Sequence, residues 1–139
     1  MYEYKFKFSR VIDGDTVDGV IDVGFGICLK ERVRLIGINA PETRLQQSIK
    51  DPKERAAEKE KGLKAKARLK AILKEGSKQP EGLYIKTFLD KKGKYGRILG
   101  DIKYIYARDL FNMKQGHDPW VGWKSVNTQL VQEGLALPI

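Results

Sequence analysis

An arginine interrupts an apolar stretch of the sequence, and polar residues follow directly after that stretch. In VRLIGINAPET, residues 33–43, Arg34 lies among aliphatic residues of a predicted β-strand, and Asn39 and Glu42 come at its end. A guanidinium inside an apolar strand must find an anion, because an unpaired buried charge destabilises a fold. That anion belongs either to the protein or to a substrate.

Other charged residues of this kind fall at predicted turns. Asp13 and Asp15 belong to the turn DGD, and Arg97 ends the segment KYGR. Two arginines can clamp an anionic phosphodiester, Asp and Asn oxygens suit a hard divalent cation, and a further carboxylate can activate a water. These residue types predict phosphodiester hydrolysis. The alternative is a structural network in which Arg34 pairs with Asp15 or Glu42 inside the fold.

The composition indicates a globular protein with an anionic partner. The chain has 139 residues, of which 41% are hydrophobic and 32% charged, and this size predicts a single domain over residues 1–139. The formal net charge is +9, and residues 50–78 hold eleven Lys or Arg against five Asp or Glu. Such a charge favours a polyanionic partner. Alternatively, this segment is only a well-solvated helix.

Signals for membranes, secretion and cysteine chemistry are absent from the sequence. No run approaches the ~18 apolar residues of a membrane span. The N-terminus, MYEYKFKFSR, lacks the apolar core of a signal peptide, which favours a cytoplasmic over a secreted protein. The one cysteine, Cys28, excludes an intramolecular disulfide and a multi-cysteine zinc site. Because it lies in the apolar stretch FGICL, we expect its thiol to be buried.

Alternation and glycine placement predict five β-strands. Aromatic residues alternate with charged ones in the first, and glycines in the second predict a strand that bends or bulges. The predicted strands span residues 2–8, 16–29, 33–39, 83–89 and 97–107.

Two helices complete the expected fold. Asp51 as N-cap and Pro52 at the first position begin a lysine-rich helix that ends near Gly76. Gly62 in its middle marks a kink or a close contact, and a short helix spans 126–133. The apolar residues expected on the long helix are Leu63, Ala67, Leu69, Ile72 and Leu73. Together the elements predict an α+β, mainly β fold: a five-stranded OB-fold Greek-key barrel with the long helix between strands 3 and 4.

Three motifs in order, VIDGDT, RLIGINAPET and KYGR, resemble the staphylococcal nuclease (thermonuclease-like) family. The resemblance runs from Arg10 to Ala136 and includes the tail VNTQLVQEGLA and the spacing of Gly62 and Ala65. It implies an OB-fold and a calcium-dependent endonuclease that cuts DNA and RNA and leaves 3′-phosphate ends. We expect little sequence preference, because no base-reading helix is visible and charge dominates, and we expect a monomer with no membrane partner.

The resemblance also implies a ligand set for calcium. Asp15 resembles the carboxylate that holds the ion, and Ala40 stands where a backbone carbonyl binds it. Asn39 occupies the position where the family usually has a second aspartate. It keeps an oxygen donor but removes one negative charge, so calcium affinity is expected to fall or metal preference to widen.

For the reaction itself, Glu42 resembles the residue assigned to activate the attacking water, and Arg34 and Arg97 resemble the two phosphate-clamping arginines. Lys94 and Tyr95 fall where the family contacts the phosphate and sugar of the nucleotide. On this interpretation the anion that Arg34 binds is the substrate phosphate, with local carboxylates as its partners when the site is empty.

Two other functions stay open at the level of sequence. The first is a nucleic-acid-binding domain of the same fold without catalysis, for which Asn39 is the one favourable residue. The second is an interaction module that uses the basic helix. In the loop over 108–125, Trp120 or Trp123 could stack on nucleobases, although packing on the barrel is the alternative that we expect, and His117 is expected to be a solvated loop residue.

Overall fold

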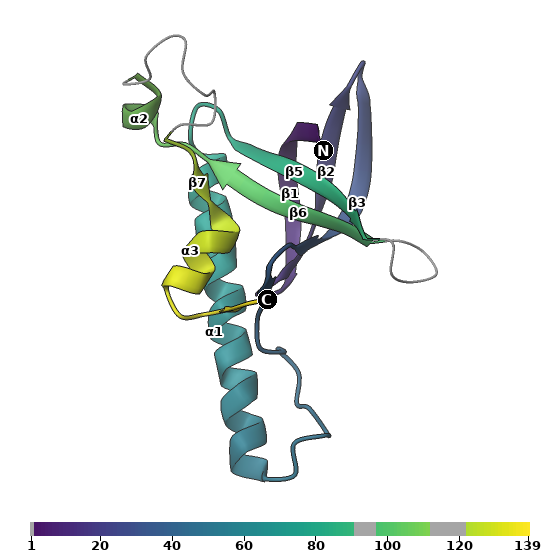
Figure 1. Cartoon of the computed structure of the whole chain (residues 1–139), viewed down its shortest axis with the longest axis vertical. Coiled ribbons are helices and arrows are strands. Elements are labelled where there is room, and N and C mark those ends of the chain that lie inside the picture. The colour runs from purple at the N-terminus through teal and green to yellow at the C-terminus, as the bar shows by residue number, and fades with distance from the viewer. Residues whose placement is uncertain (1, 91–96, 112–121) are drawn as a thin grey trace.

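The computed structural model describes residues 2–90, 97–111 and 122–139. Five strands form one sheet in the order β3-β2-β1-β5-β6. Neighbours in that order are antiparallel, and a parallel pairing of β3 with β6 joins the two ends into a barrel (Figure 1). The predicted five-stranded barrel is confirmed, and this one parallel pair makes its sheet mixed. The strands are β1 (Tyr2–Asp13), β2 (Thr16–Gly24), β3 (Ile27–Leu35), β5 (Leu83–Asp90) and β6 (Arg97–Tyr104).

Glycines divide two segments that the sequence predicted as single strands. The segment 16–29 is a hairpin, because β2 ends at Gly24 and β3 begins at Ile27 after a turn whose residues have positive φ. The segment 33–39 is broken at Gly37, with φ of 78°, between β3 and the short β4 (Ile38–Asn39). Glycine adopts these left-handed conformations without the steric penalty of other residues, so the chain can reverse there.

Cys28 is exposed, so the prediction of a buried thiol was wrong. It lies on the part of β3 that extends past the pairing with β6, which begins only at Val33. An apolar neighbourhood in sequence therefore does not become a buried one, because the hairpin runs beyond the barrel at this point.

The long helix α1 (Pro52–Ser77) begins and ends close to the predicted residues. The side chain of Asp51 accepts a hydrogen bond from the Lys53 N–H at 3.0 Å and so caps its N-terminus. Residues at helical spacing face the barrel and are buried: Gly62, Ala65, Leu69, Ile72, Leu73 and Gly76. Leu63 and Ala67 fall off this spacing and are exposed, so the prediction of an inward position for them was wrong.

The remaining elements are short. They are α2 (Ala107–Phe111), β7 (Lys124–Ser125), α3 (Val126–Gln132) and β8 (Leu137–Pro138). The predicted C-terminal helix is confirmed as α3, whereas β6 ends at Tyr104 and not at 107. Trp123 packs edge-on against Tyr84 with ring centroids 5.2 Å apart, as expected for packing on the barrel. The predictions for His117 and Trp120 lie outside the described residues.

A buried amide ties α3 to the closure of the barrel. Asn127 donates to the carbonyls of Ile36 and Gly100 at 2.9 and 3.0 Å, and its side-chain oxygen accepts from the Ile102 N–H at 3.4 Å. These backbone groups lie where β3 meets β6, so one side chain from α3 satisfies polar groups of the barrel at its seam.

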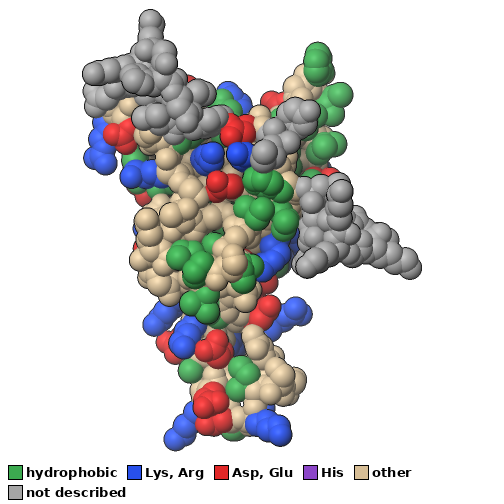
Figure 2. Space-filling model, viewed as in Figure 1, with side chains coloured by type: hydrophobic (Ala, Val, Ile, Leu, Met, Phe, Trp, Pro, Cys, Tyr) green, Lys and Arg blue, Asp and Glu red, His purple; other side chains and the backbone are tan. Residues whose placement is uncertain are grey.

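Charged residues cover α1 on its solvent side. Figure 2 shows Lys and Arg side chains over the lower half of the molecule, where α1 lies, interspersed with Asp and Glu. None of the helices in the described ranges is long and apolar enough to cross a membrane.

Candidate active site

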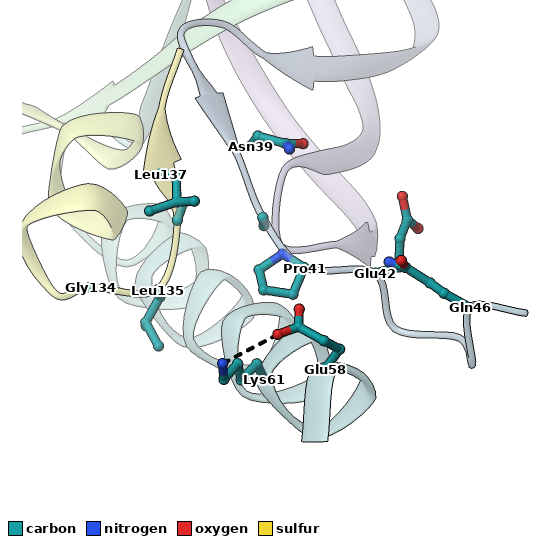
Figure 3. A pocket seen from close by; sticks show the side chains of 11 residues that line it. Asn39, Pro41, Glu42, Gln46, Glu58, Lys61, Gly134, Leu135 and Leu137 are labelled. Atoms are coloured by element: carbon teal, nitrogen blue, oxygen red, sulfur yellow. Dashed lines mark hydrogen bonds and ion pairs between the residues drawn. The ribbon is translucent and has the colours of Figure 1, made fainter. Parts of the chain in front are cut away.

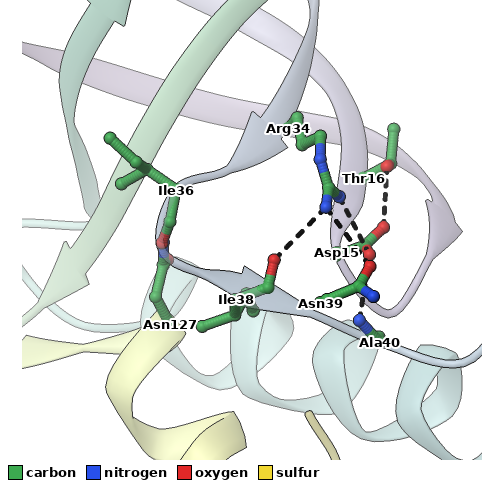
Figure 4. A network of polar contacts seen from close by, with 8 residues as sticks. All are labelled: Asp15, Thr16, Arg34, Ile36, Ile38, Asn39, Ala40 and Asn127. Carbon is green, nitrogen blue, oxygen red and sulfur yellow. Dashed lines mark hydrogen bonds and ion pairs between the residues drawn. The ribbon is translucent and has the colours of Figure 1, made fainter. Parts of the chain in front are cut away.

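The turn between β1 and β2 places Asp15 in the interior. Asp15 is only 6% exposed. One carboxylate oxygen, Oδ1, accepts from the Thr16 hydroxyl at 3.0 Å, and the other, Oδ2, accepts from the Ala40 N–H at 3.0 Å (Figure 4). Its backbone carbonyl accepts from the Leu35 N–H at 2.8 Å. The turn is thereby fixed both to the end of β3 and to the segment that follows β4.

Arg34 points from β3 toward this carboxylate. Its Nη1 lies 2.9 Å from Asp15 Oδ2, and its Nη2 donates to the carbonyl of Ile38 and to Oδ1 of Asn39, both at 3.3 Å (Figure 4). In this structure the anion that neutralises Arg34 is therefore Asp15. Because a guanidinium carries five N–H donors and this side chain is 22% exposed, the contacts leave donors for a phosphate oxygen.

The oxygens around Arg34 are of the kind that a hard cation binds. Asp15 and Asn39 both contact the same guanidinium, so their oxygens already hold one positive charge between them. With the backbone carbonyl of Ala40 they make an all-oxygen donor set, which suits Ca²⁺ when waters complete the coordination. In residues 2–90, 97–111 and 122–139, no three His, Cys, Asp or Glu side chains gather as a metal cluster. The set therefore fits calcium in ligand type and is low in negative charge.

Glu42 lies on the exposed loop that follows β4. It lines a cavity of about 420 Å³ together with Asn39, Ala40 and, from α1, Glu58 and Lys61 (Figure 3). Lys61 is engaged with Glu58 at 3.2 Å. A carboxylate in this position is accessible to water and stands two residues from the Ala40 backbone that binds Asp15.

Small residues on α1 allow the loop of Glu42 to approach the helix backbone. A Cβ built on Gly62 would lie 2.0 Å from the carbonyl oxygen of Glu42 and 2.8 Å from that of Pro41. The predicted close contact at Gly62 is therefore confirmed. One turn further along, Ala65 meets the turn of Asp15, where a Cβ on Gly14 would lie 2.6 Å from the Ala65 Cβ. Helix α1 is the common support of both segments.

A hydroxyl that sequence reasoning missed joins these two segments directly. Thr43 donates to Oδ1 of Asp13 at 2.7 Å. Asp13 was singled out for possible chemistry, and the structure gives it this contact with the loop of Glu42. The only signal in the sequence is a threonine next to the candidate carboxylate, which does not by itself identify a partner thirty residues away.

The predicted residues of the KYGR segment are only partly visible. Lys94 and Tyr95 lie outside the described residues, and for Arg97 the structure gives the backbone alone. Arg97 opens β6, whose register places Leu99 beside Arg34. The strand that carries Arg97 therefore runs alongside the strand that carries Arg34. The side chains that the structure brings together are Asp15, Arg34 and Asn39, with the Ala40 backbone among them and Glu42 on the adjoining loop.

A closed mixed barrel with a long helix beneath two polar loops defines the OB-fold class. The sequence model of the staphylococcal nuclease homologue family matches residues 32–139. The chain belongs to this family, whose members are typically calcium-dependent nucleases, and the membership is consistent with nuclease activity on a nucleic acid substrate. The matched range contains Arg34, Asn39 and Glu42 and begins after the turn of Asp15. A search of curated proteins found no match.

Proposed function

We propose that this protein is a calcium-dependent endonuclease that hydrolyses phosphodiester bonds of DNA and RNA with little sequence preference and leaves 3′-phosphate ends. The observation that carries the proposal is the meeting of Asp15 and Asn39 at the guanidinium of Arg34, beside the water-accessible carboxylate of Glu42. Residues 1–139 form one domain in this proposal, and Ca²⁺ is its metal.

Arg34 has the first role when substrate enters. A phosphate oxygen takes N–H donors of the guanidinium and competes with Asp15 for the rest, so the phosphate is held next to the oxygen donors. Arg97 is assigned to the same phosphate from the neighbouring strand. As negative charge grows on the phosphoryl oxygens in the transition state, the two guanidiniums stabilise it more strongly than the ground state.

Glu42 acts on the nucleophile. Its carboxylate accepts a proton from a water as the water oxygen bonds to phosphorus, and the bond from phosphorus to the 5′ oxygen breaks. The 5′ oxygen leaves and takes up a proton to become a hydroxyl, and the phosphate stays on the 3′ side. Because Glu42 is exposed and lines an open cavity, a water can reach it from solvent.

Calcium would be held by Asp15, Asn39 and the Ala40 carbonyl, and when bound it would compensate charge on the phosphate. The chain holds Asp15 ready by the Thr16 hydroxyl and the Ala40 N–H, which orient both carboxylate oxygens. Lys94 and Tyr95 are assigned to the adjacent phosphate and sugar. The basic side chains of α1 add attraction that is independent of sequence, so binding should fall steeply with salt.

The test measures hydrolysis of single-stranded DNA and RNA by the wild type, Glu42→Gln and Glu58→Gln, each with Ca²⁺ and with a chelator. Glu58 lines the same cavity from α1 and is the matched control. We expect cleavage by the wild type and Glu58→Gln only with calcium, and none by Glu42→Gln, which should still retain DNA in a gel shift. Parallel loss of binding and cleavage in Glu42→Gln would mean that Glu42 is structural.

A nucleic-acid-binding domain without catalysis is the second candidate. Asn39 in place of a second carboxylate and the direct ion pair between Arg34 and Asp15 favour it. Retention of DNA with no cleavage of either substrate under any metal would support this candidate over the nuclease.

A further inference from the structure

The β2–β3 hairpin extends beyond the barrel and exposes large apolar side chains. β2 and β3 pair along their whole length, up to Gly24 opposite Ile27, but β6 joins β3 only at Val33–Leu35. The part past this closure projects into solvent (Figure 1) and carries hydrophobic side chains at its end (Figure 2). Phe25 is 102% exposed, Ile27 52% and Leu29 43%.

These side chains belong to one face of the hairpin. Leu29 lies opposite the buried Ile21, and residues two apart on a strand share a face, so Val23 and Ile27 extend the same inner face of the barrel wall. Cys28 lies opposite Asp22 on the other face. The apolar lining of the barrel therefore continues past the barrel, where the strands across from it have ended.

Phe25 adopts a conformation that the hairpin does not need from a phenylalanine. It is the one non-glycine residue with positive φ in the described ranges, at 56°. A left-handed conformation costs roughly 1–2 kcal/mol for a residue with a Cβ, and Gly or Asn would avoid most of that penalty. A strained, fully exposed aromatic ring gives the isolated chain nothing, so its use must lie in contact with another molecule.

An apolar cavity lies beside this face at the open end of the barrel. Its volume is about 250 Å³. The described residues that line it are Tyr4, Ile21, Val23, Leu29, Thr87, Phe88 and Ile98. None of these carries a charge, although the chain as a whole has a net charge of +9. A polyanion would bind where the cations are, so this uncharged surface selects an apolar partner.

We infer that the partner is a second copy of this chain, and that Phe25 of each copy inserts into the barrel-end cavity of the other. The chain carries a projecting ring and a cavity of suitable size and chemistry side by side. A two-fold axis can therefore satisfy both contacts at once. The absence of charge in the cavity lining lets two chains of net charge +9 meet there without local repulsion.

The expected interface is small. A buried aromatic side chain contributes about 150–250 Å², and two copies of Phe25 with parts of Ile27 and Leu29 stay below the ~1,200 Å² of a standard interface. The dimer should be weak and reversible. The sequence alone predicted a monomer because Phe25 and Ile27 were assigned to a bent strand, whereas the structure places them at the end of a projecting hairpin. This inference does not depend on the proposed nuclease activity.

The first experiment is light scattering or sedimentation on the full chain at high salt, from about 1 µM to about 1 mM, the range of weak association. We expect the wild-type mass to rise from monomer to dimer and Phe25→Ser to remain monomeric. Leu63→Ser is the matched control, because Leu63 is 46% exposed on α1 away from the hairpin, and it should dimerise normally. A wild type that stays monomeric, or a Phe25→Ser variant that dimerises equally, would overturn the inference.

A second experiment tests the insertion itself. Val23→Glu places a charge in the cavity and should also abolish the homodimer. A mixture of Val23→Glu and Phe25→Ser still offers one intact ring and one intact cavity, so a heterodimer should form. Energy transfer between dyes on Cys28, the only cysteine and on the opposite face of the hairpin, reports it. Absence of transfer in the mixture, with transfer in the wild type, would refute this arrangement.

Discussion

Replacing Gly62 by alanine should impair catalysis more than it impairs folding. The added methyl would lie 2.0 Å from the carbonyl oxygen of Glu42, and real Cβ atoms essentially never come within 3.0 Å of another heavy atom. The helix and the loop must therefore separate by about 1 Å. What moves is the backbone of Glu42 and Pro41, which cannot rotate away as the end of a flexible side chain can.

Two opposing terms set the effect of Gly62→Ala on stability. Alanine is favoured over glycine inside a helix by about 1 kcal/mol, whereas overpacking of a close contact destabilises by about 1–3 kcal/mol. The free energy of unfolding should fall by about 2 kcal/mol or less. A misplacement of 1 Å in a catalytic group can reduce the rate by about 100-fold, which corresponds to about 2.7 kcal/mol in the activation free energy. Because kcat reports folded molecules, the two effects are separable.

Gly76→Ala provides the matched control for this measurement. Gly76 is buried on the same face of the same helix, and its added Cβ would lie 2.7 Å from Leu83 Cδ2, the end of a side chain. We would measure kcat and KM on a single-stranded DNA oligonucleotide with calcium, and urea unfolding, for both variants. Both should change stability modestly, and only Gly62→Ala should lose kcat with little change in KM. A wild-type kcat in Gly62→Ala, or equal losses in both variants, would refute the positioning of Glu42 by α1.

Three further predictions concern the metal, the clamp and pH. Asn39→Asp should lower the calcium concentration required for the half-maximal rate, because a second carboxylate adds charge to the site; a higher requirement would exclude this position as a ligand. Arg34→Ala should lower the cleavage rate by about 100-fold or more and destabilise the fold by up to about 3 kcal/mol in urea unfolding, since Asp15 loses its counter-ion; unchanged kinetics would argue against the clamp. Glu133 accepts a hydrogen bond from Arg68 at 2.6 Å, which holds its pKa below the ordinary 4.5, so the pair stabilises the fold above that pH and its contribution is lost as pH falls through the folded-state pKa. Glu133→Gln should therefore be less stable than the wild type at pH 7 by under about 1 kcal/mol, because the pair is about one-third exposed, and this difference should disappear on acidification in thermal unfolding; a difference that persists in acid would show that charge is not its cause.

Local signals were sufficient for the barrel and for the main helix. Alternation, the Asp51–Pro52 helix start and the final glycine near 134 each act over a few residues, and the structure has the elements they predict. The hairpin at Gly24–Gly26 was missed because apolar residues recur at every second position on both sides of the turn, so the pattern reads as one strand. The burial of Cys28 was wrong for the same reason, since local hydrophobicity says nothing of where the opposite strands end.

The candidate site was predictable in residue type and not in contacts. Charged residues at strand ends indicated Asp15, Arg34 and Glu42, but spacing could not decide which anion Arg34 binds. The structure gives Asp15 as its partner. The hydrogen bond of Thr43 to Asp13 joins residues thirty positions apart, and such pairings depend on how the strands and loops are arranged in space. The roles assigned to these residues stay predictions until the variants are assayed.

The seam held by Asn127 also bears on how the chain reaches its native state. Its hydrogen bond to the carbonyl of Ile36 spans 91 residues of sequence, and contacts of such separation form late because a large loop must close before they can be made. During synthesis, β1 to β3 can pair as they emerge, but the parallel pairing of β3 with β6 and its support by α3 must wait for the last part of the chain. The arginine at the centre of the proposed site lies on the strand that waits. A nascent chain therefore acquires its complete phosphate site only when synthesis has passed residue 127, which delays any cleavage of nucleic acid near the ribosome.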